Sequence, residues 1–408
     1  PTPYLRHYDD PADAQKYFDY VTDTYSEYNA AKELSLEEAE EDVNYLFDAF
    51  YYDFAFYDYF GGHTVFDQAK AEILQELQAK DNLTCKDLQE ILVKHLTFIK
   101  DGHFNINHNF PAEKEIPFFF RQVMFVKTDS GYQDSKGKTV VSVDGHPDLD
   151  TLFKRSISQE GYLVYYPVLL KEAKFDGTEW DKHVCDEQLT VHYADGSTDV
   201  LTADTWSQYY KDLPKDQNTD LRQTDGIPVF QFNSFDGSFL QEVNAAAAQM
   251  SDAAISMLDL RSNVGYEEVA HQWITRYSRQ RVQGNGVRYD VVNPVSVAIA
   301  HRWQTHDNIL ILLSGKCSAS SAEITMDLAY NLENSLIIGE NTNGCMIGNG
   351  GHVELPNSKC SVIMTSVCVY LLPEGADYFE EMRGLSPDIW VPAKEAETLA
   401  AKLMENLK

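Results

Sequence analysis

A strand–turn–helix segment around residue 320 carries side chains that could act as a nucleophile. The text NILILLSGKCSASSAEITMDLAYNL indicates a buried strand, a Ser-rich turn and an amphipathic helix. This arrangement exposes a serine hydroxyl at a helix N-terminus, where free backbone N–H groups can stabilise an oxyanion. The predicted chemistry is nucleophilic attack by a serine of this turn. A serine at a helix start is more often only an N-cap, and residue types alone leave that alternative open.

A second turn of interest is DLRSNVGYEE, residues 259–268, where a buried strand ends in Asn-Val-Gly and a helix begins. Gly265 would let the backbone approach a substrate carbonyl closely. The alternative is an ordinary strand-to-helix turn in which Asp259 and Arg261 form a structural ion pair.

A general base must take the proton of the serine, and histidine suits this role because its pKa lies near neutrality. Among the twelve histidines, His103 lies in LTFIKDGHFNINH, in a Gly-containing loop after an apolar helix. Loops of this kind often present functional side chains. His103 is therefore one candidate for the base, and the residues alone leave the other histidines open.

The elements that must position these residues lie in regions with different sequence patterns. Residues 35–60 open with a Ser and a Glu three residues later and continue with apolar positions at helical spacing, which predicts a capped helix ending before Gly61. Two further helices are predicted over about 64–80 and 84–99. We expect a helical N-terminal domain over residues 1–110.

Beyond this region the sequence changes to short β-type runs punctuated by Asp-Gly turns, as in GKTVVSVDGHP and QLTVHYADGSTDVLTA. We expect a β-rich module over 111–222, with a linker at 211–226. Strands and helices then alternate, beginning with IPVFQFNSF, which predicts an α/β catalytic domain over 223–408 that ends in a C-terminal helix. The fold class is thus a multidomain mixture of α and β.

The composition limits the function classes. The chain has 408 residues, 43% apolar and 24% charged, as in a soluble globular protein. Its 33 basic and 64 acidic side chains give a formal charge of -31, which disfavours nucleic acid and anionic lipid as partners. This excess of acidic side chains could attract basic peptides, but a solvated surface without a specific partner explains it better. No transmembrane segment is predicted. The six cysteines form no CxxC pair, so we expect free thiols, no metal and no cofactor.

Five blocks in order resemble one family: IPVFQFNSF, ISMLDLRSNVG, LLSGKCSASSAE, SLIIGENTNG and LLPEGADYFEEMRGLSPDIWV. They are similar to the C-terminal-processing and tricorn-core serine peptidases, also called the tail-specific protease type. The upstream LSLEEAEEDVNYL and LTFIKDGHF resemble the tricorn-like branch. The resemblance implies a ClpP/crotonase-like α/β catalytic domain. The middle module, with GKTVVSVDGHP, resembles part of a PDZ domain, although a plain β-domain is an equal alternative.

The resemblance also implies roles for individual residues. Ser320 is the nucleophile, the N–H groups of Gly265 and Ser321 form the oxyanion hole, and His103 is the base. Glu381, in EMRGLSPD, is the third member of the tricorn-type relay.

Three positions depart from the family pattern. Cys345 stands where the processing peptidases have their catalytic Lys, so a Ser/Lys dyad is absent. Gly102 replaces the Ser that precedes the His in the tricorn relay, and this weakens the link from Glu381 to the imidazole. Tyr266 replaces a second Gly, which would narrow the substrate groove.

The resemblance implies a serine endopeptidase that cleaves loosely structured polypeptides toward their C-terminal side through an acyl-enzyme. It also implies an extracytoplasmic or secreted location, and a first residue other than methionine agrees with a trimmed precursor. One alternative is an inactive member of the fold that binds peptides or apolar ligands. Another makes Cys345 the nucleophile. The sequence does not indicate the oligomeric state.

Overall fold

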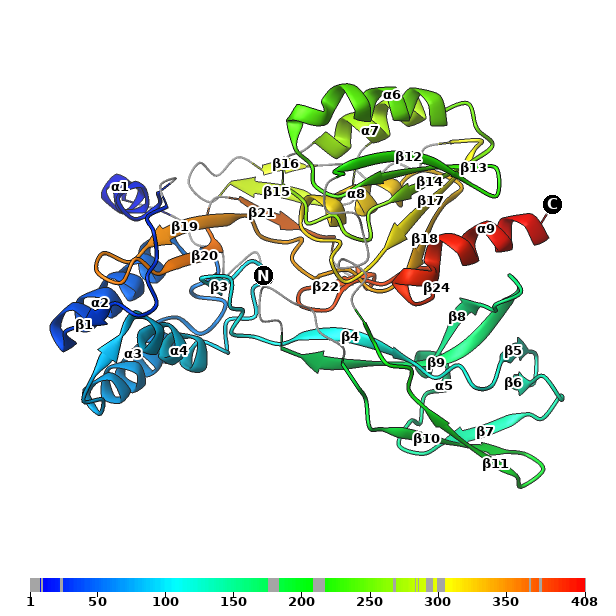
Figure 1. Ribbon diagram of the computed structural model, residues 1–408, viewed down its shortest axis with the longest axis horizontal. Helices are drawn as coiled ribbons and strands as arrows, with labels where there is room; N and C mark the ends of the chain where they lie inside the picture. The colour runs from blue at the N-terminus through cyan, green and yellow to red at the C-terminus, as the bar shows by residue number, and fades with distance from the viewer. Residues whose placement is uncertain are drawn as a thin grey trace.

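The computed structural model describes residues 8–407 except 9, 23–24, 175–182, 208–216, 267–268, 283, 285, 291–295, 299–304, 367 and 374–375. Figure 1 shows a helical region at one end, an α/β layer with strands and helices, and a β-rich module below that layer. The predicted mixture of helices and sheets is confirmed. No helix within the described ranges is long and apolar enough to cross a membrane.

The N-terminal region is helical, as predicted. It contains α1 (Pro11–Tyr20), α2 (Leu36–Asp53), α3 (Gly62–Gln78) and α4 (Cys85–His95). The predicted capping box is present, because Ser35 and Glu38 each accept the other's backbone N–H, at 3.2 and 2.8 Å. The prediction that this helix runs to residue 60 was wrong. Phe54 has extended backbone angles, and the N–H of Ala55 bonds to the carbonyl of Thr365.

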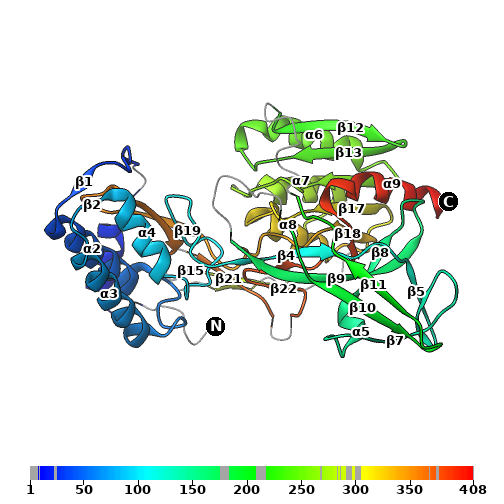
Figure 2. The ribbon, with the colours of Figure 1, turned by 60° about the horizontal axis from the view of Figure 1, so that its bottom comes forward.

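Strands from much later in the chain complete the core of the helical region. The sheet of β3 (Asn105–Ile106), β20 (Ser361–Thr365) and β19 (Gly350–Glu354) packs Val353, Val362 and Met364 among the apolar side chains of α2, α3 and α4. Figures 1 and 2 show this orange hairpin against the blue helices. A small pair, β1 (Glu33–Leu34) and β2 (Leu83–Thr84), joins the helices. The predicted domain boundaries at 110 and 222 stay predictions.

The C-terminal part is built on a sheet of six strands in the order β12-β13-β14-β17-β18-β24. The members are β12 (Thr219–Thr224), β13 (Ile227–Phe232), β14 (Ile255–Asp259), β17 (Ile309–Ser314), β18 (Ser335–Gly339) and β24 (Ile389–Trp390). Neighbours are parallel except β12 and β13.

The predicted linker at 211–226 was wrong over residues 219–224, which form β12, whereas 208–216 lie outside the described residues. The reason is the tight turn at Asp225 and Gly226. Both have positive φ, 49° and 78°, which suits a two-residue hairpin turn between antiparallel strands.

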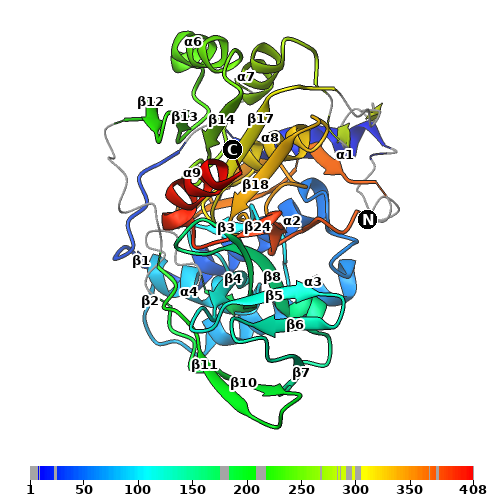
Figure 3. The same cartoon turned by 90° about the vertical axis from the view of Figure 1, so that its right-hand side faces the viewer.

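Helices cover both faces of this sheet, so its inner strands are largely apolar, whereas the edge strand β12 is mostly polar and partly exposed. Side chains alternate between faces along each strand. Phe230, Leu258 and Leu312 pack with α6 (Leu240–Met250), α7 (Val269–Ser278) and α8 (Ser321–Ala329). Their neighbours Val229 and Met257 pack with α9 (Ala396–Asn406). Figure 3 shows the red α9 and the green α6 and α7 on opposite sides of the strands.

The middle region is β-rich, as expected. One sheet has the order β4-β9-β5-β6 with β8 beside β9, and another has the order β11-β10-β7. The elements are β4 (Lys114–Phe119), β5 (Phe125–Thr128), β6 (Gly131–Asp134), β7 (Val140–Val143), α5 (Leu149–Leu152), β8 (Phe153–Ile157), β9 (Leu163–Ala173), β10 (Gln188–Tyr193) and β11 (Thr198–Thr202). The likeness to a PDZ domain stays a prediction.

Short elements complete the chain. The sheet β16-β15-β21 consists of β16 (Ser296–Ala298), β15 (Val287–Asp290) and β21 (Cys368–Leu371), and β22 (Phe379–Glu380) pairs with β23 (Gly384–Leu385). Two 3-10 turns, η3 (Gly237–Phe239) and η4 (Ala393–Glu395), precede α6 and α9. All six cysteines are free thiols, in agreement with the prediction.

One buried carboxyl in α2 makes stability depend on pH. Asp53 has no exposed surface, and neither of its oxygens has a hydrogen-bond partner among the described residues. Burial raises its pKa to about 9. The folded state therefore holds a proton that the unfolded state loses near pH 4, so stability falls by about 1.4 kcal/mol per pH unit between those values.

We expect Asp53→Asn to match the wild type in thermal unfolding near pH 4 and to exceed its Tm increasingly up to pH 8. The amide has nearly the same shape as the neutral carboxyl but cannot ionise. Unfolding curves across this pH range give the measurement. A difference in Tm between the two proteins that does not change with pH would contradict the assignment.

Candidate active site

Ser320 sits in the turn between β17 and α8, as the sequence predicts. Its backbone has φ 54° and ψ −116°, a strained conformation for a residue with a side chain. The turn is fixed from both sides. The hydroxyl of Ser318 donates to the carbonyl of Leu260 at 2.7 Å, and the N–H of Asn343 donates to the carbonyl of Ser318 at 2.8 Å. This strained turn holds the Ser320 side chain at a partly exposed position.

The structure brings His103 and Ser320 together from positions 217 residues apart. The Nε2 atom of His103 lies 3.1 Å from the Oγ atom of Ser320, which is hydrogen-bonding distance. Burial lowers the pKa of His103, and this effect outweighs the opposing attraction of Asp101. The imidazole is therefore neutral at pH 7 and able to accept the serine proton.

The predicted third member, Glu381, does not hydrogen-bond to the imidazole. Its Oε1 atom accepts the backbone N–H of Gly102 at 2.9 Å, and its Oε2 atom accepts that of Ile347 at 3.4 Å. Burial raises the pKa of Glu381 well above its usual range, and the charges of Asp101 and Glu323 raise it further. Glu381 thus supports the backbone beside His103.

Close packing explains why a glycine, Gly102, precedes His103. A Cβ atom at Gly102 would lie 2.2 Å from the carbonyl oxygen of Gly344 and 2.5 Å from the Cβ atom of Cys345. The serine of the tricorn relay therefore cannot fit here without moving the 344–345 turn. Gly102 allows that turn to pack directly against the histidine loop.

Asp101 was not predicted as a site residue, although it is part of the KDGH text. Its side chain is 2% exposed, and its carboxylate accepts the N–H of His103 at 3.0 Å and that of Thr365 at 3.1 Å. Potential proton-binding atoms of Asp101, His103 and Glu381 all lie within 4.8 Å of one another. Such spacing could also suit a cation, but a metal-free site stays the prediction.

Lys114, at the start of β4, is a second residue that the sequence analysis missed. It is 1% exposed, and its Nζ atom donates to the carbonyl of Gly102 at 3.0 Å and to the side-chain oxygen of Asn343. It thereby ties the histidine loop to the turn after β18. No local sequence signal marks this lysine, because its partners are distant in sequence.

The two residues predicted to supply oxyanion donors, Ser321 and Gly265, lie close to the nucleophile. Ser321 is the first residue of α8, and an N–H at that position has no acceptor within its helix. Gly265 packs so closely that a Cβ atom there would lie 3.0 Å from the nitrogen of Ser321. The N–H of Gly265 donates to the side-chain oxygen of Asn263 at 2.8 Å, so a substrate oxyanion must replace that bond. Asn263 was missed in the sequence analysis, although it lies in the DLRSNVG block.

Tyr266, the position where the family has a second glycine, keeps a glycine-like backbone with φ 103°. Its side chain is 75% exposed, and its carbonyl accepts the hydroxyl of Ser321 at 3.0 Å. The predicted narrowing of the groove stays a prediction.

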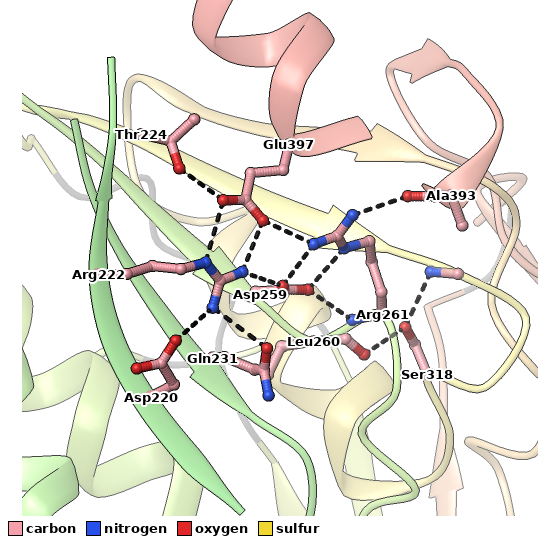
Figure 4. Close-up of polar contacts among 11 residues, drawn as sticks. Asp220, Arg222, Thr224, Gln231, Asp259, Leu260, Arg261, Ser318, Ala393 and Glu397 are labelled. Carbon is pink, nitrogen blue, oxygen red and sulfur yellow. Dashed lines mark hydrogen bonds and ion pairs between the residues drawn. The ribbon is translucent and has the colours of Figure 1, made fainter. Parts of the chain in front are cut away.

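A buried ion network holds the Asp259–Gly265 turn (Figure 4). Arg261 is paired with Asp259 at 2.6 Å and with Glu397 of α9 at 2.8 Å, so the structural ion pair predicted from the sequence is confirmed. Arg222 of β12 bridges the same two carboxylates. The network fixes the C-terminal helix beside the strand that leads to Gly265, and it connects through Leu260 to Ser318.

Cys345 is 5% exposed, and burial raises the pKa of its thiol well above the usual value. The N–H of Ser320 lowers this pKa, but the effect of burial is larger. A thiol held neutral in this way is a poor nucleophile, which argues against the alternative that Cys345 carries the chemistry.

The solved structure of mature CPAF shares this fold, and the predicted resemblance to the C-terminal-processing and tricorn-core peptidases is confirmed at this level. The structure of mature CPAF superposes on 91% of this chain and 96% of its own, with a TM-score of 0.50 and 12% identity. The structure of the photosystem II D1 C-terminal processing protease covers 86% of this chain and 92% of its own, with 15% identity and a TM-score of 0.38. The structure of the tricorn protease covers 91% of this chain and 37% of its own, with 12% identity and a TM-score of 0.43. No protein-family model and no curated protein matches the sequence.

Proposed function

We propose that this chain is a serine peptidase in which Ser320 is the nucleophile and His103 the general base. The observation that carries the proposal is the 3.1 Å contact between the His103 Nε2 and Ser320 Oγ atoms. A neutral imidazole at this distance removes the hydroxyl proton as the oxygen attacks an amide carbonyl, and then gives the proton to the leaving amine. Water hydrolyses the resulting acyl-enzyme by the same route in reverse.

The developing oxyanion is stabilised by the N–H groups of Ser321 and Gly265. That of Ser321 is at a helix N-terminus, where the helix dipole adds to the attraction. That of Gly265 exchanges its bond with the Asn263 side chain for one with the substrate. Glu381 acts by holding the backbone of Gly102, one residue before the base.

The proposed substrate is a loosely structured polypeptide cut toward its C-terminal side, outside the cytoplasm. Support for this part comes from the resemblance of the sequence blocks to C-terminal-processing peptidases and from the shared fold. The partly exposed positions of Ser320 and His103 are compatible with access by an extended chain.

A fluorophosphonate probe tests the proposal before any substrate is known. We expect the probe to modify Ser320 in the wild type, with the adduct located by mass spectrometry of the peptide that contains it. His103→Gln should lose the reaction, because the probe needs the activated hydroxyl. A folded wild type that leaves Ser320 unmodified would contradict the proposal and favour the binding-protein alternative.

A further inference from the structure

Two carboxyl groups lie beside His103, and they differ in their surroundings. Asp101 is enclosed, and its oxygens accept one N–H from the histidine itself and one from Thr365 of β20. Glu381 is partly exposed, and it accepts the N–H groups of Gly102 and Ile347, the latter at a long 3.4 Å. Their oxygens and a ring nitrogen of His103 all lie within 4.8 Å of one another.

The second nitrogen of the imidazole needs a charged neighbour. Nδ1 of His103 is buried and has no hydrogen-bond partner among the described residues. For Nε2 to accept the serine proton, Nδ1 must carry a hydrogen, and the ring becomes a cation during the reaction. A cation in a buried position is costly unless a negative charge lies close by.

The two carboxyl groups compete to supply that charge. Like charges this close disfavour each other, so a charge on one group disfavours ionisation of the other. The other charged groups that act on Glu381 are Glu323, which also disfavours its ionisation, and Lys114, which favours it. Burial and the charge of Asp101 are the two largest causes that raise the pKa of Glu381. For His103, the attraction of Asp101 is opposed by Lys114 and aided by Glu323.

We propose that Asp101, and not Glu381, is the negatively charged group that positions His103 and stabilises its protonated form. The inference rests on the proposed function for its catalytic meaning, although the charge assignment is measurable without activity. Asp101 holds the histidine backbone through the 3.0 Å bond to its N–H. Glu381 is a neutral hydrogen-bonding group that supports the loop.

The direct test is the NMR titration of His103 in protein with labelled histidine, with the signal assigned by its loss in His103→Gln. We expect Asp101→Asn to lower the pKa of His103 by about one unit or more, because an attracting charge disappears. Glu381→Gln, which replaces one neutral group by another, should leave that pKa within about 0.3 unit. A larger shift in Glu381→Gln than in Asp101→Asn, or equal shifts in both, would overturn the proposal.

A second measurement keeps the proposal testable if Asp101→Asn does not fold. In the wild type with labelled glutamate, the side-chain carboxyl signal of Glu381 should be that of a protonated acid at pH 7. An ionised Glu381 would overturn the proposal. These signals are independent of hydrolysis, so a failure of the proposed function would be seen separately as an unmodified Ser320 in the probe experiment.

With a polypeptide substrate, the same variants should differ in their pH profiles. Asp101→Asn should lower kcat about 100-fold or more and move the acidic limb of kcat/KM to lower pH, since the base loses its proton more readily. Glu381→Gln should keep the acidic limb in place and lower kcat only a few-fold. A lower kcat in Asp101→Asn with an unmoved acidic limb would indicate a merely structural role and overturn the proposal.

Discussion

Ser320→Ala is expected to abolish hydrolysis while the fold remains intact. The hydroxyl oxygen supplies the covalent route, and its loss removes the acyl-enzyme altogether. In serine peptidases the nucleophile and the base act as a unit, and the loss of either costs about a million-fold in kcat. We expect His103→Gln to lose activity to a similar extent, and the double variant to lose little more than either single one.

Stability should change little in Ser320→Ala, because the side chain is partly exposed and the backbone bonds of the turn remain. The measurement compares peptide release by mass spectrometry with thermal unfolding of the same samples. Ser238→Ala provides the matched control, since Ser238 is exposed and lies in η3, the 3-10 turn before α6. Hydrolysis by Ser320→Ala at the wild-type rate would show that another group attacks the substrate.

Local sequence signals predicted the elements that carry the nucleophile. The apolar run of β17, the small residues of the turn and the periodic apolar positions of α8 act over short distances, so they can be recognised in the sequence. The Ser35–Glu38 capping box is another local signal, and it is present in the structure. The hairpin at Asp225 and Gly226 also had a local signal, which the linker interpretation overlooked.

The surroundings of the base could not be predicted in the same way. His103 was selected by resemblance. Asp101 also bonds to the nearby N–H of His103, but its contact with Thr365 and the contact of Lys114 with Asn343 involve strands and turns far along the chain. The requirement for Gly102 likewise arises from a turn more than two hundred residues away. Long-range packing sets these contacts, and the spacing of residues in one sequence does not reveal it.

Packing also decided where α2 ends. Its apolar periodicity continues to residue 60, yet the backbone leaves the helix at Phe54 because Ala55 bonds to Thr365 of β20. Thr365 is the same residue whose N–H reaches Asp101. One strand from the C-terminal part thus both ends a helix of the N-terminal region and supports the loop of the base.

Glu323→Gln is expected to destabilise the protein by about 3–5 kcal/mol and to remove most of its activity. Glu323 lies in the first turn of α8 and has no exposed surface. Its carboxylate accepts four hydrogen bonds, from the N–H of Ser320 at 3.0 Å, the hydroxyl of Thr342 at 2.5 Å, and the N–H groups of Gly344 and Cys345 at 2.8 and 3.0 Å. A glutamine amide would place an N–H group against these donors.

The loss of activity in Glu323→Gln should exceed what the loss of stability explains at temperatures where the variant is folded. Glu323 holds both the backbone of Ser320 and the 344–345 turn, and that turn packs against Gly102 beside the base. Releasing the 344–345 turn loosens the nucleophile relative to His103, and a shift of about 1 Å can cost 100-fold in rate.

Thermal unfolding and kcat of the Glu323→Gln variant give the two measurements. Glu333→Gln, at an exposed position after the same helix, should change stability by less than about 0.5 kcal/mol. Equal losses in the two variants would mean that the four bonds to Glu323 do not position Ser320.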